Sequence, residues 1–131
     1  MTVTDEIPVL IVDDQSAFRS AARTVVMIAS GFTVTAEAES GEQAIELIES
    51  DGGFDRGVVL MDINLGGITG IEATRRVTEG RPDLAVVLMS TYTAEDLPAD
   101  AVDCGAVTYV HKEDLGPDVL AAAWAANRAA R

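Results

Sequence analysis

Cysteine, histidine and basic residues are scarce in this chain of 131 residues. The single cysteine, Cys104, cannot form a disulfide within the chain, and no basic neighbour would activate its thiol, so we expect a small buried hydrophobe. Nine Lys and Arg against 22 Asp and Glu give a formal net charge of −13. This field repels DNA and anionic membranes, so we expect no direct nucleic-acid binding and favour cations and basic protein surfaces as partners.

Long apolar runs are also absent. No stretch approaches the roughly 20 residues that a membrane-spanning helix needs. The first residues, 1–6, are mostly polar with two acids and lead into an apolar run too short for a signal peptide. No repeat, low-complexity tract or linker divides residues 1–131. We therefore expect one cytoplasmic domain over residues 1–131, with no output domain in this chain and no membrane partner.

Short apolar runs alternate five times with helix-length amphipathic stretches. Hydrophobic residues make up 48% of the chain, enough for a genuine core. The first, third and fourth runs are apolar throughout, as in central strands covered on both faces, whereas the second and fifth are mixed, as in edge strands. This pattern predicts a flavodoxin-like α/β three-layer sandwich, with a five-stranded parallel sheet in the order 2-1-3-4-5 and five helices. The five runs are 9–12, 32–37, 58–61, 85–89 and 106–111.

The stretches between these runs carry helix signals. Ser40 and Gln43 have the spacing of a capping box, and Gly31 stands where the first helix should end. The fourth helix is the least defined, because Pro98 would fall inside the first turns of a helix capped by Thr93. That helix either begins late, near Pro98, or has a distorted first turn. Right-handed crossovers would place the first and fifth helices on one face of the sheet and the other three on the opposite face.

Polar residues follow four of the apolar runs. They are Asp13 and Asp14 after the first run, Asp62 after the third, Ser90 after the fourth and Lys112 after the fifth. Each alone is an ordinary strand end, but all these ends lie at one edge of a parallel sheet. Three neighbouring carboxylates need a cation or a raised pKa, and their oxygens suit Mg²⁺. A carboxylate in this setting can accept a phosphoryl group while the cation, a lysine and a hydroxyl neutralise its oxygens.

The chain resembles the receiver domains of two-component response regulators from Val9 to about Trp124. Each shared motif is weak alone, but their order and spacing together are specific. The resemblance implies that a sensor histidine kinase phosphorylates Asp62, with Mg²⁺ as cofactor, and that the chain is a signalling switch. The motifs are Asp13-Asp14, Leu60-Met61-Asp62-Ile63-Asn64, Ser90 and Tyr109-Val110-His111-Lys112.

The same resemblance assigns roles within the site. It implies that Asp14, Asp62 and the backbone carbonyl of Asn64 bind Mg²⁺, while Asp13 assists through water. Lys112 would contact the phosphoryl group.

Two further residues would form the switch. By the resemblance, Ser90 moves to hydrogen-bond the phosphoryl group, and Tyr109 turns inward as Ser90 leaves its resting place. Thr91 stands where alanine is commoner and would narrow access to the acceptor. The change would reach the face made by the fourth helix, the fifth strand and the fifth helix, which would control a partner or output domain and is a candidate homodimer contact.

Residues 70–73 and 112–115 are most similar to receivers that precede LuxR-type helix-turn-helix domains, which makes regulation of transcription one candidate output. A stand-alone receiver and a fragment of a longer regulator both remain open. Gly66 stands where the family usually has a proline, so we expect a less stiff acceptor loop.

Two other functions compete with the switch. An aspartyl-phosphate phosphotransferase or phosphatase of the haloacid-dehalogenase type carries a second acid two residues after its nucleophile, where this chain has Asn64. A degenerate receiver would bind partners without phosphorylation. Three carboxylates that repel one another argue against it, because keeping them together is costly unless a cation binds there. We therefore expect no enzyme activity beyond the domain's own phosphorylation and dephosphorylation.

Predictions can also be made for three further residues. Tyr92 should shield the phosphoryl group from water and slow its hydrolysis. His111 is expected to be a partly exposed surface residue, and Trp124 to be a core contact of the last helix rather than a dimer anchor.

Overall fold

The computed structural model describes residues 6–91 and 97–129. The strands form one parallel sheet in the order β2-β1-β3-β4-β5, which is the predicted order. The flavodoxin-like sheet is therefore confirmed. The strands are β1 (Ile7–Val12), β2 (Phe32–Ala38), β3 (Gly57–Asp62), β4 (Leu84–Ser90) and β5 (Thr108–His111).

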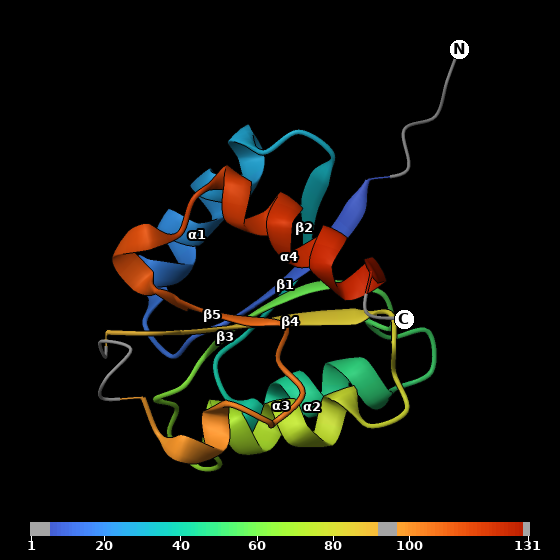
Figure 1. Cartoon of the computed structure of the whole chain (residues 1–131), viewed down its shortest axis with the longest axis vertical. Coiled ribbons are helices and arrows are strands. Elements are labelled where there is room, and N and C mark those ends of the chain that lie inside the picture. Colours follow the sequence, from blue (N-terminus) through green and yellow to red (C-terminus); the bar gives the residue numbers. More distant parts are fainter. Residues whose placement is uncertain (1–5, 92–96, 130–131) are drawn as a thin grey trace.

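Helices cover both faces of the sheet (Figure 1). The first and last helices lie on one face and the second and third on the other, as right-handed crossovers require. The Ser40 side chain accepts a hydrogen bond from the Gln43 N–H at 3.1 Å, so the predicted cap of the second helix is present. The α-helices of the described residues are α1 (Ser16–Ile28), α2 (Gly41–Glu49), α3 (Gly70–Thr78) and α4 (Pro117–Ala129), with 3-10 helices η2 (Ala99–Ala101) and η3 (Lys112–Asp114).

The segment between β4 and β5 differs from the prediction. We expected five α-helices, but the part of this segment that the structure describes holds only the three-residue η2. Pro98 is the N-cap of η2 and has an extended ψ of 141°, so it does not begin an α-helix. Gly105, with a φ of +105°, ends the segment only a few residues later. Thr93, the alternative cap, lies outside the described residues.

Two apolar clusters hold the layers together because the strand side chains alternate between the faces. One cluster packs strand residues such as Leu10 and Met61 against α2 and α3. The other packs residues such as Val9 and Leu60 against α1 and α4, and it includes Trp124, which is only 8% exposed. The core position of Trp124 and the burial of Cys104 confirm the two predictions made for them.

The start of β3 requires a glycine. Gly57 has a φ of +132°, and a Cβ atom there would collide with the carbonyl oxygen of Pro8 in β1. We expect Gly57→Ala to lower the free energy of unfolding by about 2–4 kcal/mol, because the strained backbone and the collision add. Gly31→Ala, at a φ of +90° with open space around it, should cost only about 1 kcal/mol. Urea unfolding followed by circular dichroism measures both. Equal losses would show that the approach of Pro8 is unimportant.

Candidate functional site

The carboxyl ends of four strands bring the predicted polar side chains to one edge of the sheet. Asp62 and Ser90 are the last residues of β3 and β4, and both are buried. Asp13 directly follows β1, and Lys112 begins η3 directly after β5. The apolar strands are covered on both faces, so the first polar side chains appear where each strand leaves the core.

Three carboxylates form the centre of this edge. One oxygen each of Asp13, Asp14 and Asp62 lies within 4.8 Å of the others. Asp13 is fully buried and Asp62 is 3% exposed, whereas Asp14 faces solvent. A pocket of about 190 Å³ lies beside them. Clustered carboxylate oxygens next to open space are a donor set that fits a hard divalent cation. The pocket is lined by Asp14, Gln15, Asp62, Asn64, Thr91 and Lys112.

Lys112 lies between the two buried carboxylates. Its Nζ is 2.7 Å from Asp13 Oδ2 and 3.6 Å from Asp62 Oδ2. It also lies 4.5 Å from the centre of the Phe18 ring, so the ammonium is held over an aromatic face. Asp13 Oδ2 is buried, and its partner is the Lys112 ammonium. One ammonium against three carboxylates leaves an excess of negative charge that a divalent cation would balance.

Hydrogen bonds from the backbone orient the two buried carboxylates. Asp13 Oδ1 accepts a bond from the Gln15 N–H at 2.8 Å, and Asp62 Oδ1 accepts one from the Asn64 N–H at 3.3 Å. The Arg19 guanidinium donates to the carbonyl of Asp13 at 2.6 Å. The Oδ2 atoms of both acids therefore point to Lys112, while their Oδ1 atoms are held by their own loops.

Burial raises the pKa of Asp62 to about 6, and the neighbouring Asp13 carboxylate adds to the rise. Lys112 acts in the opposite direction and lowers this pKa, as does the Asn64 N–H. A carboxyl group attacks phosphorus only when it is ionised. A cation bound among these acids would favour that ionised form.

The predicted switch residues lie in contact. Ser90 Oγ is 2.9 Å from Tyr109 OH, and Tyr109 is half-buried against the core on the α2 and α3 side. Thr91 is exposed and lines the small pocket, as expected from its place after Ser90. Tyr92 lies outside the described residues, so its predicted shielding of the acceptor stays a prediction.

The sequence did not reveal the role of His111. It is half-buried, and its Nε2 lies 3.1 Å from the carbonyl oxygen of Thr91. Its Nδ1 accepts a hydrogen bond from the Glu113 N–H at 3.1 Å. These two bonds assign a neutral ring with its proton on Nε2. His111 is thus partly exposed, as predicted, and it also joins the end of β4 to the start of η3.

The sequence also gave no sign that Phe18 and Arg19 belong to the site. Both lie in the first turn of α1, a few residues after Asp13 and Asp14. This position close to the acids is the one feature of the sequence that could have indicated their contact with the site. Arg19 forms an ion pair with Glu37 at 3.3 Å as well as its bond to Asp13. This pairing joins α1 to the end of β2.

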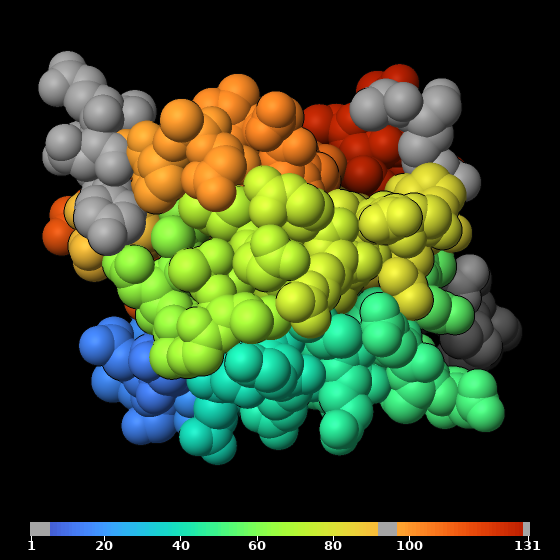
Figure 2. Space-filling model, turned by 90° about the horizontal axis from the view of Figure 1, so that it is seen from below, coloured from blue at the N-terminus to red at the C-terminus, as the bar shows by residue number. Residues whose placement is uncertain are grey.

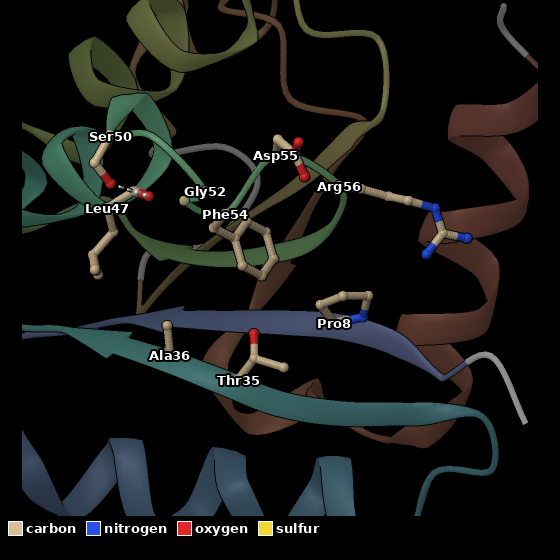
Figure 3. Close-up of a pocket in the computed structure, with 10 residues that line it drawn as sticks. Pro8, Thr35, Ala36, Leu47, Ser50, Gly52, Phe54, Asp55 and Arg56 are labelled. Carbon is tan, nitrogen blue, oxygen red and sulfur yellow. Dashed lines mark hydrogen bonds between the residues drawn. The ribbon is translucent and has the colours of Figure 1, made fainter. Parts of the chain in front are cut away.

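A second, larger pocket lies away from these acids. It has a volume of about 520 Å³ and lies between residues of β1 and β2 and the segment that joins α2 to β3. Figure 3 shows Pro8 and Thr35 on the strands, across from Ser50 and Asp55 on the segment between α2 and β3. No cluster of acids or metal ligands lines it, so its size alone does not make it the reactive site.

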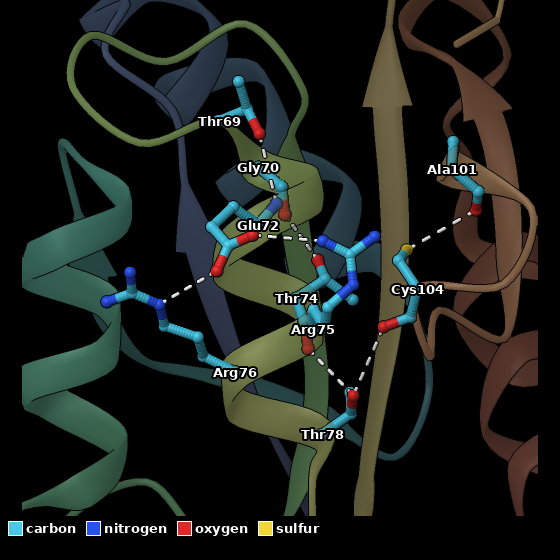
Figure 4. A network of polar contacts seen from close by, with 9 residues as sticks. All are labelled: Thr69, Gly70, Glu72, Thr74, Arg75, Arg76, Thr78, Ala101 and Cys104. Atoms are coloured by element: carbon cyan, nitrogen blue, oxygen red, sulfur yellow. Dashed lines mark hydrogen bonds and ion pairs between the residues drawn. The ribbon is translucent and has the colours of Figure 1, made fainter. Parts of the chain in front are cut away.

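A polar network joins the start of α3 to η2 (Figure 4). Thr74 donates to the carbonyl of Gly70 at 2.7 Å, and Thr78 donates to that of Thr74 at 2.8 Å. Thr78 also reaches the carbonyl of Cys104 at 3.5 Å, and the Cys104 thiol contacts that of Ala101 at 3.4 Å. The helix that follows the Asp62 loop is therefore linked to the segment before β5.

Comparison with known proteins identifies the family. The model of the response regulator receiver domain matches residues 9–124, so this chain belongs to that family. It is 34% identical over 109 residues to the transcriptional regulatory protein DegU of Brevibacillus brevis, covering 83% of this chain and 45% of that protein. It is 34% identical over 116 residues to the response regulator UvrY of Escherichia coli K12, covering 88% and 52%. The chain spans about half the length of these relatives.

Solved structures agree with this assignment. A two-component response regulator of the LuxR family from Aurantimonas sp. SI85-9A1 superposes with a TM-score of 0.77 at 28% identity, covering 96% of this chain and 87% of that chain. The response regulator ChrA of a heme-sensing two-component system gives a TM-score of 0.73 at 30% identity, covering 97% and 59%. The predicted resemblance to receivers of two-component regulators, with relatives of the LuxR type, is therefore confirmed. Among the described residues, no helix has the length and apolar character that crossing a membrane requires.

The raised pKa of Asp62 predicts a pH-dependent stability. Because the folded value of about 6 exceeds the ordinary 3.8, ionised Asp62 destabilises the folded state. That loss is absent below pH 4 and complete above pH 7, and the two pKa values correspond to about 3 kcal/mol. We expect Asp62→Asn to raise the free energy of unfolding at pH 8 by about 1–3 kcal/mol without metal, and to have little effect at pH 4.

Urea unfolding in a chelator at both pH values measures this difference. The exposed Asp51 offers a control, because Asp51→Asn removes the same charge without relieving a buried group. If Asp62→Asn is no more stable than Asp51→Asn at pH 8, burial of the ionised Asp62 carboxylate does not destabilise the folded state.

Proposed function

We propose that this domain is a phosphorylation-activated signalling switch in which Asp62 accepts a phosphoryl group from a sensor histidine kinase in the cytoplasm. The observation that carries this proposal is a buried carboxylate placed beside one lysine, two further acids and a small pocket. Asp62 Oδ2 lies 3.6 Å from the Lys112 ammonium, which is close enough to neutralise an arriving phosphoryl oxygen after a small movement. Family membership supports the kinase as donor.

The phosphoryl transfer is a displacement at phosphorus. A carboxylate oxygen of Asp62 forms a bond to phosphorus as the bond from phosphorus to the donor's histidine nitrogen breaks, and that nitrogen leaves with the electron pair. Lys112 offsets charge on the phosphoryl oxygens. Thr91 lines the pocket, so its hydroxyl can donate to them, whereas Ser90 would first have to leave Tyr109. His111 holds the Thr91 carbonyl and so fixes this edge.

Mg²⁺ is the cofactor that the donor set fits. Asp14 and Asp62 would hold it together with the backbone carbonyl of Asn64, and Asp13 would assist through water. When bound, it supplies positive charge that balances the acids and the transferring phosphoryl group. The tight carboxylate cluster, with one lysine to balance three acids in the described residues, supports this assignment.

An enzyme acting on free substrates is less well supported. The pocket of about 190 Å³ is smaller than the roughly 300–1,000 Å³ typical of small-molecule sites. Asn64, two residues after Asp62, cannot supply the general acid that an aspartyl-phosphate phosphotransferase uses to turn over its intermediate. The phosphorylated protein is therefore the product rather than an intermediate.

The proposed output surface is the face made by η2, β5 and α4, which corresponds to the predicted fourth helix, fifth strand and fifth helix. Phosphorylation would draw Ser90 Oγ away from Tyr109 OH and let Tyr109 repack. The hydrogen bond between them and the Thr78 network in Figure 4 support this route. This face would control a partner, a homodimer contact or an output domain that regulates transcription, while the charge of −13 disfavours DNA binding by this chain itself.

Phosphorylation at Asp62 can be tested by mass. Acetyl phosphate with Mg²⁺ should add about 80 Da to the wild type, the mass of one phosphoryl group on a carboxylate nucleophile. Asp62→Asn should fold and gain nothing, and Asp51→Asn should behave as the wild type. Chelating the metal should slow labelling strongly. A labelled Asp62→Asn variant would identify another acceptor.

The coupling to the output face can be tested by hydrogen exchange. Beryllofluoride with Mg²⁺ should change amide exchange most in peptides covering residues 97–112, because η2 is only three residues long and Tyr109 would repack. The labelling rate of the buried Cys104 thiol should change in parallel. A peptide covering α2 serves as the reference. Changes confined to α2 and α3 would contradict this route.

A further inference from the structure

We infer that Glu42 is a positioning residue for the acceptor loop, defined as residues 63–69 between β3 and α3. Glu42 lies in the first turn of α2, outside the site itself. The inference rests on the proposed function, because the loop carries Asn64 and directly follows Asp62. It assigns Glu42 the task of holding the loop in the conformation that binds the cation and admits the phosphoryl group.

The contact is specific in its geometry. Glu42 Oε2 accepts a hydrogen bond from the backbone N–H of Ile68 at 3.1 Å, across 26 positions of sequence. A Cβ atom on Gly67 would lie 2.9 Å from Glu42 Oε1 and closer still to Oε2. Gly67 also has a φ of +79°. A glycine at position 67 therefore serves two needs, the left-handed backbone and the space for the Glu42 carboxylate.

The start of α2 is a firm base for this contact. A Cβ atom on Gly41 would lie 2.8 Å from Ile68 Cγ1, so the first residue of α2 already packs against the loop. The helix start is fixed by the Ser40 cap and by Gln43, whose side-chain oxygen accepts from the Glu39 N–H at 2.7 Å. Helices α2 and α3 lie side by side on this face, so the loop enters α3 next to α2 (Figure 2).

Few hydrogen bonds hold the middle of the loop, although Leu65 is buried in the core and Ile68 packs against it. Its own bonds, from Leu65 at 3.2 Å and from Gly70 at 2.9 Å, both converge on the carbonyl of Ile63. Gly66 and Gly67 follow one another, and glycines leave the backbone the most freedom. Within the described residues, Glu42 is the side chain outside the loop that hydrogen-bonds to residues 65–68.

The consequence reaches the site through the backbone. Asn64 donates its N–H to Asp62 Oδ1 and would offer its carbonyl to the cation, so both groups move if the loop moves. Supporting groups outside a metal's direct ligands commonly alter its affinity. Glu42 touches neither the acceptor nor the cation position, and its effect is exerted through Ile68 and the loop.

Three single variants separate the hydrogen bond from the charge. Glu42→Ala removes both, whereas Glu42→Gln keeps an acceptor oxygen and removes the charge. Glu46→Ala removes the same charge from an exposed position one turn along α2 and serves as the matched control. Each is compared with the wild type by hydrogen exchange of residues 63–70 without metal, by Mg²⁺ titration and by the rate of phosphorylation by acetyl phosphate.

We expect Glu42→Ala to speed exchange across residues 63–70 without metal and to weaken Mg²⁺ binding about three- to tenfold, the range that one net hydrogen bond supports. Phosphorylation at limiting Mg²⁺ should slow by a similar factor and recover at saturating Mg²⁺. Glu42→Gln should stay within about twofold of the wild type. Adding Gly66→Ala to Glu42→Ala should restore part of the affinity, because Gly66 has open space around it and alanine stiffens the loop.

The outcomes distinguish this inference from the proposed function. If the wild type binds Mg²⁺ and is phosphorylated but Glu42→Ala matches Glu46→Ala in every measurement, Glu42 does not position the loop. Equal losses in Glu42→Gln and Glu42→Ala would assign the effect to charge and also overturn the inference. A wild type that neither binds Mg²⁺ nor accepts a phosphoryl group would overturn the proposed function. The exchange measurement without metal would still test whether the hydrogen bond from Ile68 to Glu42 holds the loop.

Discussion

Repulsion among Asp13, Asp14 and Asp62 is the constraint on which the rest of this structure depends. Two of the three acids are buried, and Lys112 is the one cation paired with them in the described part of the chain. Burial first, and then repulsion by Asp13, raises the pKa of Asp62, so holding Asp62 ionised costs the folded state free energy. A fold that keeps such an imbalance at its sheet edge is held under electrostatic strain. A cation or a phosphoryl group that changes the net charge of this cluster would therefore change which packing of the surrounding side chains is most stable.

The proposed coupling depends on the packing near the acids. Ser90 is buried at the end of β4, and its hydroxyl meets Tyr109 of β5 rather than the acids. The neighbouring η2 is a three-residue helix. Ala101 and Cys104 pack in the core cluster that includes α3, and Thr78 of α3 reaches the carbonyl of Cys104 at 3.5 Å. A short element with few polar bonds is easier to displace than the α-helices on the other side of the sheet. The acids thus lie at the ends of β1 and β3, and η2 lies in the connection between the next two strands of the sheet, β4 and β5.

The sequence predicted the sheet and the acidic edge because both depend on local patterns. Continuous apolar runs before Asp13, Asp62 and Ser90 mark central strands, and parallel topology then brings their ends together. Between β4 and β5 the described residues hold the short η2 where the sequence predicted an α-helix, because Pro98 opposes the helical pattern around it. The supporting contacts of Arg19 and Glu42 were missed for a different reason. Each contact joins a side chain to a backbone group that only the folded chain brings near it. The spacing of residues along the sequence does not predict which group that is.

Those supporting contacts show how the two loops of the acidic edge are held from opposite faces of the sheet. Arg19 of α1 bonds to the carbonyl of Asp13 and is itself anchored by Glu37 of β2. Glu42 of α2 bonds to the loop that follows Asp62. The acids repel one another, so without such restraints their loops would relax apart and the charge density that attracts a cation would fall. In the proposed site, the cation affinity would therefore depend on α1 and α2 as well as on the carboxylates.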